Sequence, residues 1–330
     1  MGKTEINPLQ LADAILAGAL LDAETALTIL RAKGAELSAV LAGAHRLREA
    51  VFGTRVETCA IINAKSGRCG ENCAFCAQSS HHRTDAPVFG IKSVDEMVDG
   101  ARQAEAERSH CFGIVTSGTR IKEAAEWDLI LTAIRRIRAE TSIEPSASLG
   151  LLDADQALQL VDAGCATYHH NLETARSHFP EICTTHEYDE DVETVRVAKA
   201  AGMKVCCGGI LGLGESLEQR TELAFTLREL NVDSVPLNFL NPIAGTRLEG
   251  LHQLGPMDCL RAIALFRFAL PRQRISVCGG REHNLRDFQS WMFMAGATGT
   301  MVGNYLTTAG RDRETDLQMI ADAELELLAD

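Results

Sequence analysis

Short apolar runs alternate with amphipathic stretches along most of the chain. In the amphipathic stretches, apolar side chains recur three or four positions apart, which is the spacing of one buried helix face. The short apolar runs are typical of buried strands. They predict strands at 58–63, 111–116, 145–149, 166–171, 204–208, 234–239, 274–278 and 299–302. Because helical stretches separate these runs, the eight units favour an α/β fold of the (β/α)8 barrel type.

The helical stretches also carry starting signals. Helices are predicted at 93–106, 123–138, 153–162, 189–200, 217–230 and 256–268. Ser93, Asp153 and Ser216 stand where an N-cap side chain would accept a backbone N–H. The resulting division is an N-terminal helical extension at 1–50, a barrel at 51–310, and a segment at 311–330 whose amphipathic stretch 314–328 predicts a helix packed on the barrel.

The balance of charge narrows the class of partner. The 330 residues include 45 acidic and 32 basic ones, a net charge of -13. Nucleic acids and membrane surfaces reward clustered Lys and Arg, so neither is expected as a partner. No apolar run reaches the roughly 20 residues that span a bilayer. Met1 begins no charged-then-apolar signal sequence, so we expect a cytoplasmic location.

An open, doubly wound sheet is the alternative architecture. The glycine-rich stretch 208–215 resembles its nucleotide loop, but the spacing fails. After Gly212 and Gly214, the third glycine of the GxGxxG pattern would fall at Leu217. The barrel therefore remains the predicted fold.

Cys69, Cys73 and Cys76 form a CxxxCxxC pattern and can deliver three thiolates to one point. A cubane iron-sulfur cluster normally takes four thiolates, so three would leave one iron open. A zinc site completed by His81 or His82 is an alternative. A disulfide is disfavoured, because clustered cysteines in a total of 11 cannot pair evenly.

Further cysteines lie on predicted strands. Since side chains alternate along a strand, Cys111, Cys206 and Cys278 could all point into the barrel from different walls. They predict a second cluster there, whereas the alternative for each is a buried packing role. Cys206 and Cys207 are neighbours and cannot both face inward unless the glycines at 208–209 introduce a bulge. Packing roles alone are expected for Cys165, Cys183 and Cys259.

The segment CGENCAFCAQSSHHRTD resembles the biotin synthases, and the likeness extends from about Val56 to Thr308. These are radical S-adenosylmethionine (SAM) enzymes, in which a CxxxCxxC loop holds a 4Fe-4S cluster whose open iron binds SAM. The resemblance implies sulfur insertion into dethiobiotin by a 5'-deoxyadenosyl radical. It also implies a homodimer and an electron donor such as flavodoxin or ferredoxin.

The resemblance further implies an auxiliary cluster as sulfur donor, usually of the 2Fe-2S type and held by three cysteines and an arginine. Cys111 in HCFG and Cys206 in KVCCGG match two of these ligands. The third cysteine falls on Ser146 and the arginine on Ser276, so two ligands are altered.

We therefore predict a variant auxiliary site with Cys111, Cys206 and Cys278 as ligands, holding a 2Fe or 4Fe cluster. Cys59 or Cys207 could supply a fourth thiolate.

Several cofactor-binding and substrate-binding residues follow from the same resemblance. The segment TYHHNLET resembles the family's YNHNLDT, in which Asn171 and Glu173 match residues that contact the SAM ribose and the substrate. His169 replaces an asparagine, and an imidazole can keep a hydrogen-bond role. Phe75 matches an aromatic residue near the adenine. Asp191 stands where many members have an arginine near SAM.

Asn238 in SVPLNFL matches the asparagine that binds the ureido ring of dethiobiotin, whose carbonyl and N–H groups an amide can both satisfy. Thr307 and Thr308 match a threonine pair that holds the carboxylate tail. Two alternatives stay open: another radical SAM barrel, such as a hydrogenase-cofactor maturase or methylornithine synthase, and a zinc-stabilised binding protein.

Overall fold

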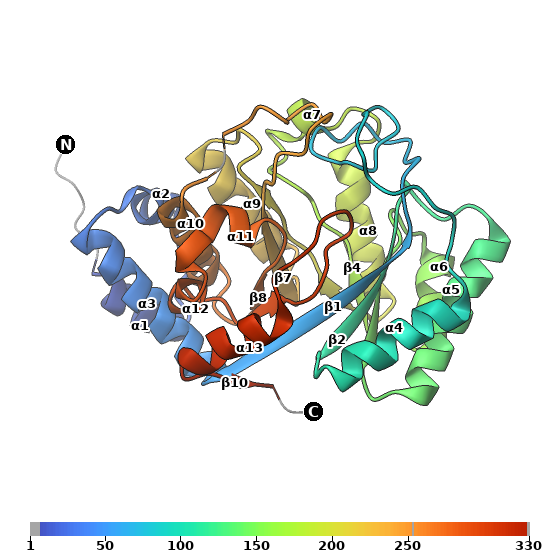
Figure 1. The fold of residues 1–330 in the computed structure, drawn as a ribbon. Coiled ribbons are helices and arrows are strands. Elements are labelled where there is room, and N and C mark those ends of the chain that lie inside the picture. Colours follow the sequence, from blue (N-terminus) through green and yellow to red (C-terminus); the bar gives the residue numbers. More distant parts are fainter. Residues whose placement is uncertain (1–6, 253, 329–330) are drawn as a thin grey trace.

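A closed barrel of parallel strands forms the centre of the molecule (Figure 1). The computed structural model describes residues 7–252 and 254–328; the ends of the predicted segments 1–50 and 311–330 lie partly outside this range. The strands are β1 (Arg55–Lys65), β2 (Cys111–Thr116), β3 (Glu144–Ser148), β4 (Thr167–His169), β5 (Lys204–Cys206), β6 (Gly209–Leu211), β7 (Ser234–Phe239), β8 (Arg274–Val277), β9 (Gly299–Met301) and β10 (Glu326–Leu327).

Their order confirms the predicted (β/α)8 fold. Neighbouring pairs run from β1 to β9 around the ring, and β9 pairs with β1 to close it. β5 and β6 both pair with β7, so together they occupy one position. Because all these pairs are parallel, the carboxyl ends of the strands meet at one mouth of the barrel.

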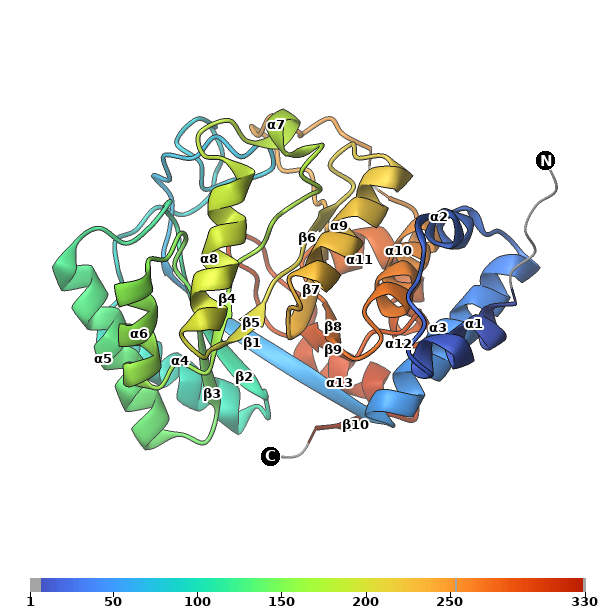
Figure 2. The ribbon, with the colours of Figure 1, turned by 180° about the vertical axis from the view of Figure 1, so that it is seen from behind.

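Helices cover the outside of the barrel, as Figures 1 and 2 show. They are α4 (Val94–Ala106), α5 (Ala124–Glu140), α6 (Ala154–Ala163), α7 (Phe179–Ile182), α8 (Tyr188–Ala200), α9 (Leu217–Glu229), α10 (Pro256–Ala269), α11 (Arg281–Leu285), α12 (Trp291–Met294) and α13 (Arg313–Asp322), with a 3-10 turn at Arg286–Phe288. The predicted caps Ser93, Asp153 and Ser216 each accept a backbone N–H and complete a capping box.

The N-terminal helices α1 (Pro8–Leu16), α2 (Ala23–Arg31) and α3 (Ala35–Phe52) pack on one side of the barrel, mainly against α10 and α9. Arg48 joins this layer to the barrel wall. Its buried guanidinium donates to the carbonyl of Ala297 at 2.9 Å and to that of Gly53 at 2.8 Å. The described helices include none long and apolar enough to cross a membrane.

The chain does not end in one long helix. The prediction of a helix at 314–328 is wrong beyond Asp322, where α13 ends. Glu324 takes a positive φ of 56°, which turns the backbone out of the helix. The following residues form β10 and pair with the start of β1, Glu326 opposite Arg55.

A break between β5 and β6 separates the two neighbouring cysteines. Cys206 faces the lumen, whereas Cys207 is fully buried in the core outside it. A Cβ atom on Gly208 would lie 2.1 Å from the carbonyl oxygen of Pro236, and one on Gly209 2.4 Å from that of Glu173. Glycine is therefore required at both positions, because the backbones approach too closely for any side chain.

Candidate active site

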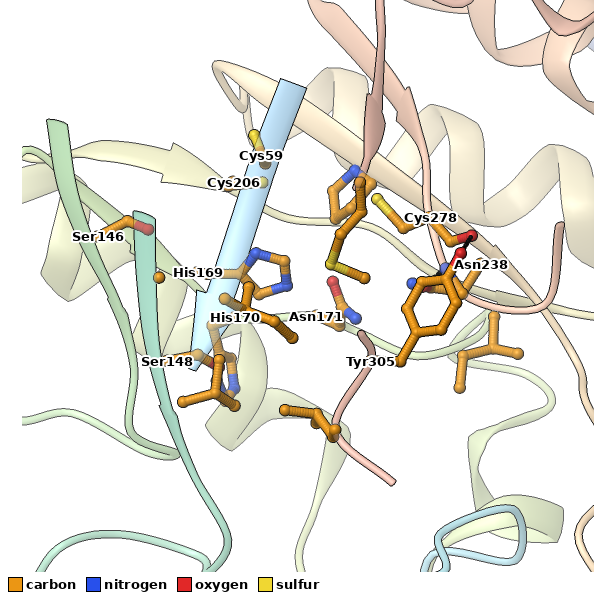
Figure 3. Close-up of a pocket in the computed structure, with 18 of the residues that line it drawn as sticks. Cys59, Ser146, Ser148, His169, His170, Asn171, Cys206, Asn238, Cys278 and Tyr305 are labelled. Carbon is orange, nitrogen blue, oxygen red and sulfur yellow. Dashed lines mark hydrogen bonds between the residues drawn. The ribbon is translucent and has the colours of Figure 1, made fainter. Parts of the chain in front are cut away.

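One cavity of about 750 Å³ runs through the lumen to the carboxyl ends of the strands. This volume lies within the usual range for binding sites of small organic molecules. The strand residues around it alternate, as expected where every second side chain points inward. They include Cys59 and Ile61 on β1, Cys111 and Gly113 on β2, Ser146 and Ser148 on β3, Thr167 and His169 on β4, and Ser234, Pro236 and Asn238 on β7. Figure 3 labels Cys59, Ser146, Ser148, His169 and Asn238 among them.

The loop between β1 and α4 brings Cys69, Cys73 and Cys76 to the mouth of this cavity. Backbone bonds fold the loop on itself: the Cys69 N–H donates to the carbonyl of Gln78 at 3.1 Å, and the Cys76 N–H to that of Cys73 at 3.0 Å. Phe75 lines the same cavity and packs against a small apolar cluster with Ile182 and Leu240.

The three loop sulfurs are spaced more widely than the ligands of a single zinc ion. The Sγ atoms of Cys69, Cys73 and Cys76 do not all lie within 4.8 Å of one another. A tetrahedral zinc ion would hold them ~3.8 Å apart, given Zn–S bonds of ~2.3 Å. The rings of His81 and His82 instead donate to the backbone carbonyls of Gly70 and Cys76, at 3.0 and 2.9 Å. These two histidines therefore brace the loop.

Cys183, which the sequence assigned to packing alone, lies beside the loop. It is buried, but its Sγ atom is 3.7 Å from that of Cys73 and 3.3 Å from Nδ1 of His186. Glu71 accepts from the same Nδ1 at 2.7 Å. Among the described residues, Glu71, Cys183 and His186 also have the compact spacing of a single-ion site. No local pattern could reveal this contact, because more than a hundred residues separate its partners.

A chain of buried polar groups continues from this point to β4. His186 donates through Nε2 to Asp191 at 3.2 Å, and His170 donates through Nε2 to the other Asp191 oxygen at 2.8 Å. Burial alone would raise the pKa of Asp191, but hydrogen bonds from the two imidazoles hold it below its ordinary value. Asp191 is thus a buried carboxylate between two histidines.

The predicted SAM-contacting residues lie at the end of β4. Asn171 donates to the Glu173 carboxylate at 3.4 Å and accepts from the Gly208 N–H at 3.1 Å. Glu173 takes a positive φ of 60°, a conformation that is rare for glutamate and common at functional sites. Burial, followed by the nearby Asp191 charge, raises the pKa of Glu173 to about 8.

His169 also faces the lumen, as Figure 3 shows. Burial, followed by the neighbouring His170, lowers the pKa of His169 to about 4, so its imidazole is neutral at pH 7. A neutral imidazole offers one donor and one acceptor to a ligand.

Asn238 and the 303–310 loop form another part of the wall. The Asn238 amide oxygen accepts from the Gly279 N–H at 2.9 Å, and its nitrogen donates to the Gly209 carbonyl at 3.3 Å. One lone pair and one N–H remain for a ligand. Thr307 and Thr308 line the same cavity. Tyr305 anchors their loop by donating to the Glu282 carboxylate at 2.9 Å.

Cys111, Cys206 and Cys278 all line the cavity, so the structure brings the three predicted auxiliary ligands to one lumen. Burial raises the pKa of Cys206 to about 12. Burial, followed by the neighbouring Cys59 and Cys206, raises that of Cys278 well above its ordinary value. These thiols would not ionise in this lumen without a bound cation. A thiol-rich wall of this kind suits an iron-sulfur cluster.

The sequence comparisons identify the family. Residues 64–227 match the model of the radical SAM superfamily, and residues 236–326 match that of the biotin and thiamin synthesis associated domain. The biotin synthase of Geobacter sulfurreducens is 60% identical over 318 residues, which cover 96% of this chain and 97% of that one. The chain belongs to the biotin synthase family. The biotin synthase of Syntrophotalea carbinolica is 59% identical over 317 residues, 96% of this chain and 97% of its own.

Solved structures agree on the fold. Methylornithine synthase (PylB) superposes with a TM-score of 0.85 at 19% identity, over 97% of both chains. The FeFe-hydrogenase maturase HydG of Carboxydothermus hydrogenoformans gives 0.79 at 17% identity, over 97% of this chain and 79% of that one. At such identities the likeness concerns the barrel alone. The family membership implies a 4Fe-4S cluster and SAM as cofactors.

Proposed function

We propose that the chain inserts sulfur into dethiobiotin, with the thiol-lined lumen holding the sulfur donor. The supporting observation is that a three-cysteine loop, the predicted substrate residues and a second group of cysteines share one cavity of about 750 Å³. A single lumen can hold three reactants in line and exclude water, which is the protein's main task in radical chemistry.

Cys69, Cys73 and Cys76 would hold the 4Fe-4S cluster and leave one iron for SAM. When bound, the cluster and SAM supply a 5'-deoxyadenosyl radical, which is able to remove hydrogen from unactivated carbon. The loop fixes the place of the cluster. Backbone hydrogen bonds within the loop, and one from the Ala74 N–H to the Ile182 carbonyl, hold it over the mouth of the barrel.

Residues at the ends of β4 and β7 would orient the two organic molecules. Asn171 and Glu173 face the cavity where the ribose hydroxyls of SAM would bind, and Phe75 offers an apolar surface to the adenine. Asn238 keeps one donor and one acceptor free for the ureido ring. Thr307 and Thr308 would bind the carboxylate tail, while neutral His169 would add a hydrogen bond without a charge.

The auxiliary cluster, as a source of sulfide, is a substrate of this reaction, with Cys111, Cys206 and Cys278 as its proposed ligands. Thiolate ligation at these positions would place labile sulfide in the same cavity as the substrate. Flavodoxin or ferredoxin as electron donor, a homodimeric state and a cytoplasmic location remain predictions from the family.

Anaerobic incubation of the reduced, reconstituted protein with SAM and dethiobiotin tests this proposal. We expect the parent protein to form biotin and 5'-deoxyadenosine. The Cys73→Ala variant should not cleave SAM, and the Cys278→Ala variant should cleave SAM without forming biotin. Cys259→Ala serves as the matched control, because Cys259 is buried in α10 away from the cavity. SAM cleavage by the parent protein without any biotin would contradict the proposal and favour another radical SAM reaction.

A further inference from the structure

Cys59 lies on the lumen face of β1, directly beside Cys111 on β2. The two residues are register partners in the parallel ladder, and their Sγ atoms are 2.7 Å apart. Both side chains are partly buried and line the cavity. A sulfur at this position therefore joins the group formed by Cys111, Cys206 and Cys278.

We propose that Cys59 is the fourth thiolate of the auxiliary iron-sulfur cluster, which would then be held by Cys59, Cys111, Cys206 and Cys278. This inference rests on the proposed function, because it names a ligand of the cluster assumed there. On binding, an Fe–S bond replaces the S–H bond of Cys59, and the proton passes to solvent. No change in oxidation state of the cysteine is involved.

The arrangement of the strands supports this ligand set. β1 and β2 are neighbours in the ring, β5 lies farther round it, and Cys278 directly follows β8, so the four sulfurs approach the lumen from three directions. Figure 3 shows Cys59 and Cys206 in one part of the lumen and Cys278 on another wall. No three of the four sulfurs lie within 4.8 Å of one another. Three or four ligands of one metal ion would lie closer together than this. A cluster receives its ligands at separate iron atoms, so the sulfurs of Cys59 and Cys111, which are 2.7 Å apart, would move apart when the cluster binds.

Other residues are poorly placed to supply the fourth ligand. Cys207, the other candidate from the sequence, is fully buried in the core outside the cavity. The Ser146 hydroxyl donates to the carbonyl of Phe112 at 3.3 Å. Arg274 forms an ion pair with Glu57 at 2.6 Å. Cys207 thus lies outside the lumen, and Ser146 and Arg274 are engaged in other contacts. Cys59, by contrast, presents a sulfur to the lumen.

The auxiliary cluster can be isolated for the test by replacing Cys69, Cys73 and Cys76 with alanine in the full chain. Cys59→Ala is then added to this parent, and Cys207→Ala serves as the matched control with the same chemical change outside the lumen. Iron, labile sulfide and Mössbauer spectra are measured after anaerobic reconstitution, and thermal melting checks that each variant is folded.

We expect Cys59→Ala either to lose at least half of the parent's iron and sulfide or to show a distinct iron site, while Cys207→Ala matches the parent. Unchanged iron, sulfide and spectrum in folded Cys59→Ala would overturn the inference. A Cys59–Cys111 disulfide, found by mass spectrometry of the reconstituted parent, would also overturn it. A parent that binds no iron would instead contradict the auxiliary cluster of the proposed function.

Discussion

The Sγ atoms of Cys73 and Cys183 lie 3.7 Å apart, although the residues are 110 positions apart in the chain. Cys73 belongs to the cluster-binding loop, and Cys183 immediately follows α7. The contact places a sulfur that is not part of the CxxxCxxC pattern next to a cluster ligand. Hydrogen bonds to cluster sulfurs are one of the factors that set the reduction potential.

We expect Cys183→Ala to make the midpoint potential of the SAM-binding cluster less negative without changing its iron content. The Cys183 sulfur accepts hydrogen bonds from Cys73 and His186, which lower its pKa to about 3, so it adds negative charge beside a cluster ligand and disfavours the reduced cluster. A contribution of about 1 kcal/mol corresponds to roughly 40 mV for one electron. Anaerobic redox titration measures the shift. Cys165→Ala, which removes a buried sulfur from the core, is the control. An unchanged potential would show that the contact has no electronic role.

His186 should make stability depend on pH. Burial alone would lower its pKa, but hydrogen bonds to Asp191 and Cys183 raise it to about 11. An unfolded histidine titrates near 6.5. The contribution of His186 to the free energy of unfolding is therefore complete below pH 6.5. It is lost as the pH rises towards 11, by up to ~1.4 kcal/mol per pH unit. The melting temperature of the anaerobic holoprotein should fall more steeply between pH 6.5 and 9 than that of the His186→Gln variant. Parallel curves would contradict this assignment.

Glu173 should make SAM binding depend on pH. With a raised pKa of about 8, its carboxyl is mostly protonated at pH 7 and mostly ionised at pH 9. Because ribose hydroxyls donate best to the ionised form, the affinity for SAM should rise roughly tenfold between these pH values. Equilibrium dialysis with the holoprotein measures it. Glu173→Gln retains only the titration of SAM itself, so an equal pH dependence in both proteins would be inconsistent with the proposed contact.

Asn238→Asp should weaken dethiobiotin binding selectively. The aspartate keeps the shape and the acceptor for the Gly279 N–H but loses the amide donor. We expect the KM for dethiobiotin to rise about 10–100-fold, as for the loss of one buried hydrogen-bond partner. The affinity for SAM, measured on the same samples, should stay within about twofold of the parent's value. A KM that does not change would remove Asn238 from the substrate site.

The strands of the barrel were predictable because local patterns determine them. Alternation along a strand was enough to place Cys111 and Cys206 on the lumen face. The same alternation allowed only one of the neighbours Cys206 and Cys207 to face inward from a regular strand, and in the structure Cys206 lines the lumen while Cys207 is buried outside it. In each case the signal lies within a few residues of the position that it describes.

Other features depend on contacts between distant segments. β10 has two residues and forms only because Glu324 turns the chain towards β1. The cluster-loop contact of Cys183 requires the segment after α7 to fold over the mouth of the barrel. Cys59 became a clear candidate ligand only when the ladder placed it beside Cys111. No short pattern encodes these distances, so sequence reasoning could not assign them.

The most direct test of the central claim follows the sulfur itself. The protein is reconstituted with isotopically labelled sulfide, freed of unbound sulfide, reduced, and given SAM and dethiobiotin in the absence of oxygen. The biotin formed in the first turnover should carry the label, and Cys278→Ala should form none while still producing 5'-deoxyadenosine. Biotin without the label, or labelled biotin from Cys278→Ala at the parent's yield, would contradict the account of a sulfur donor held within the lumen.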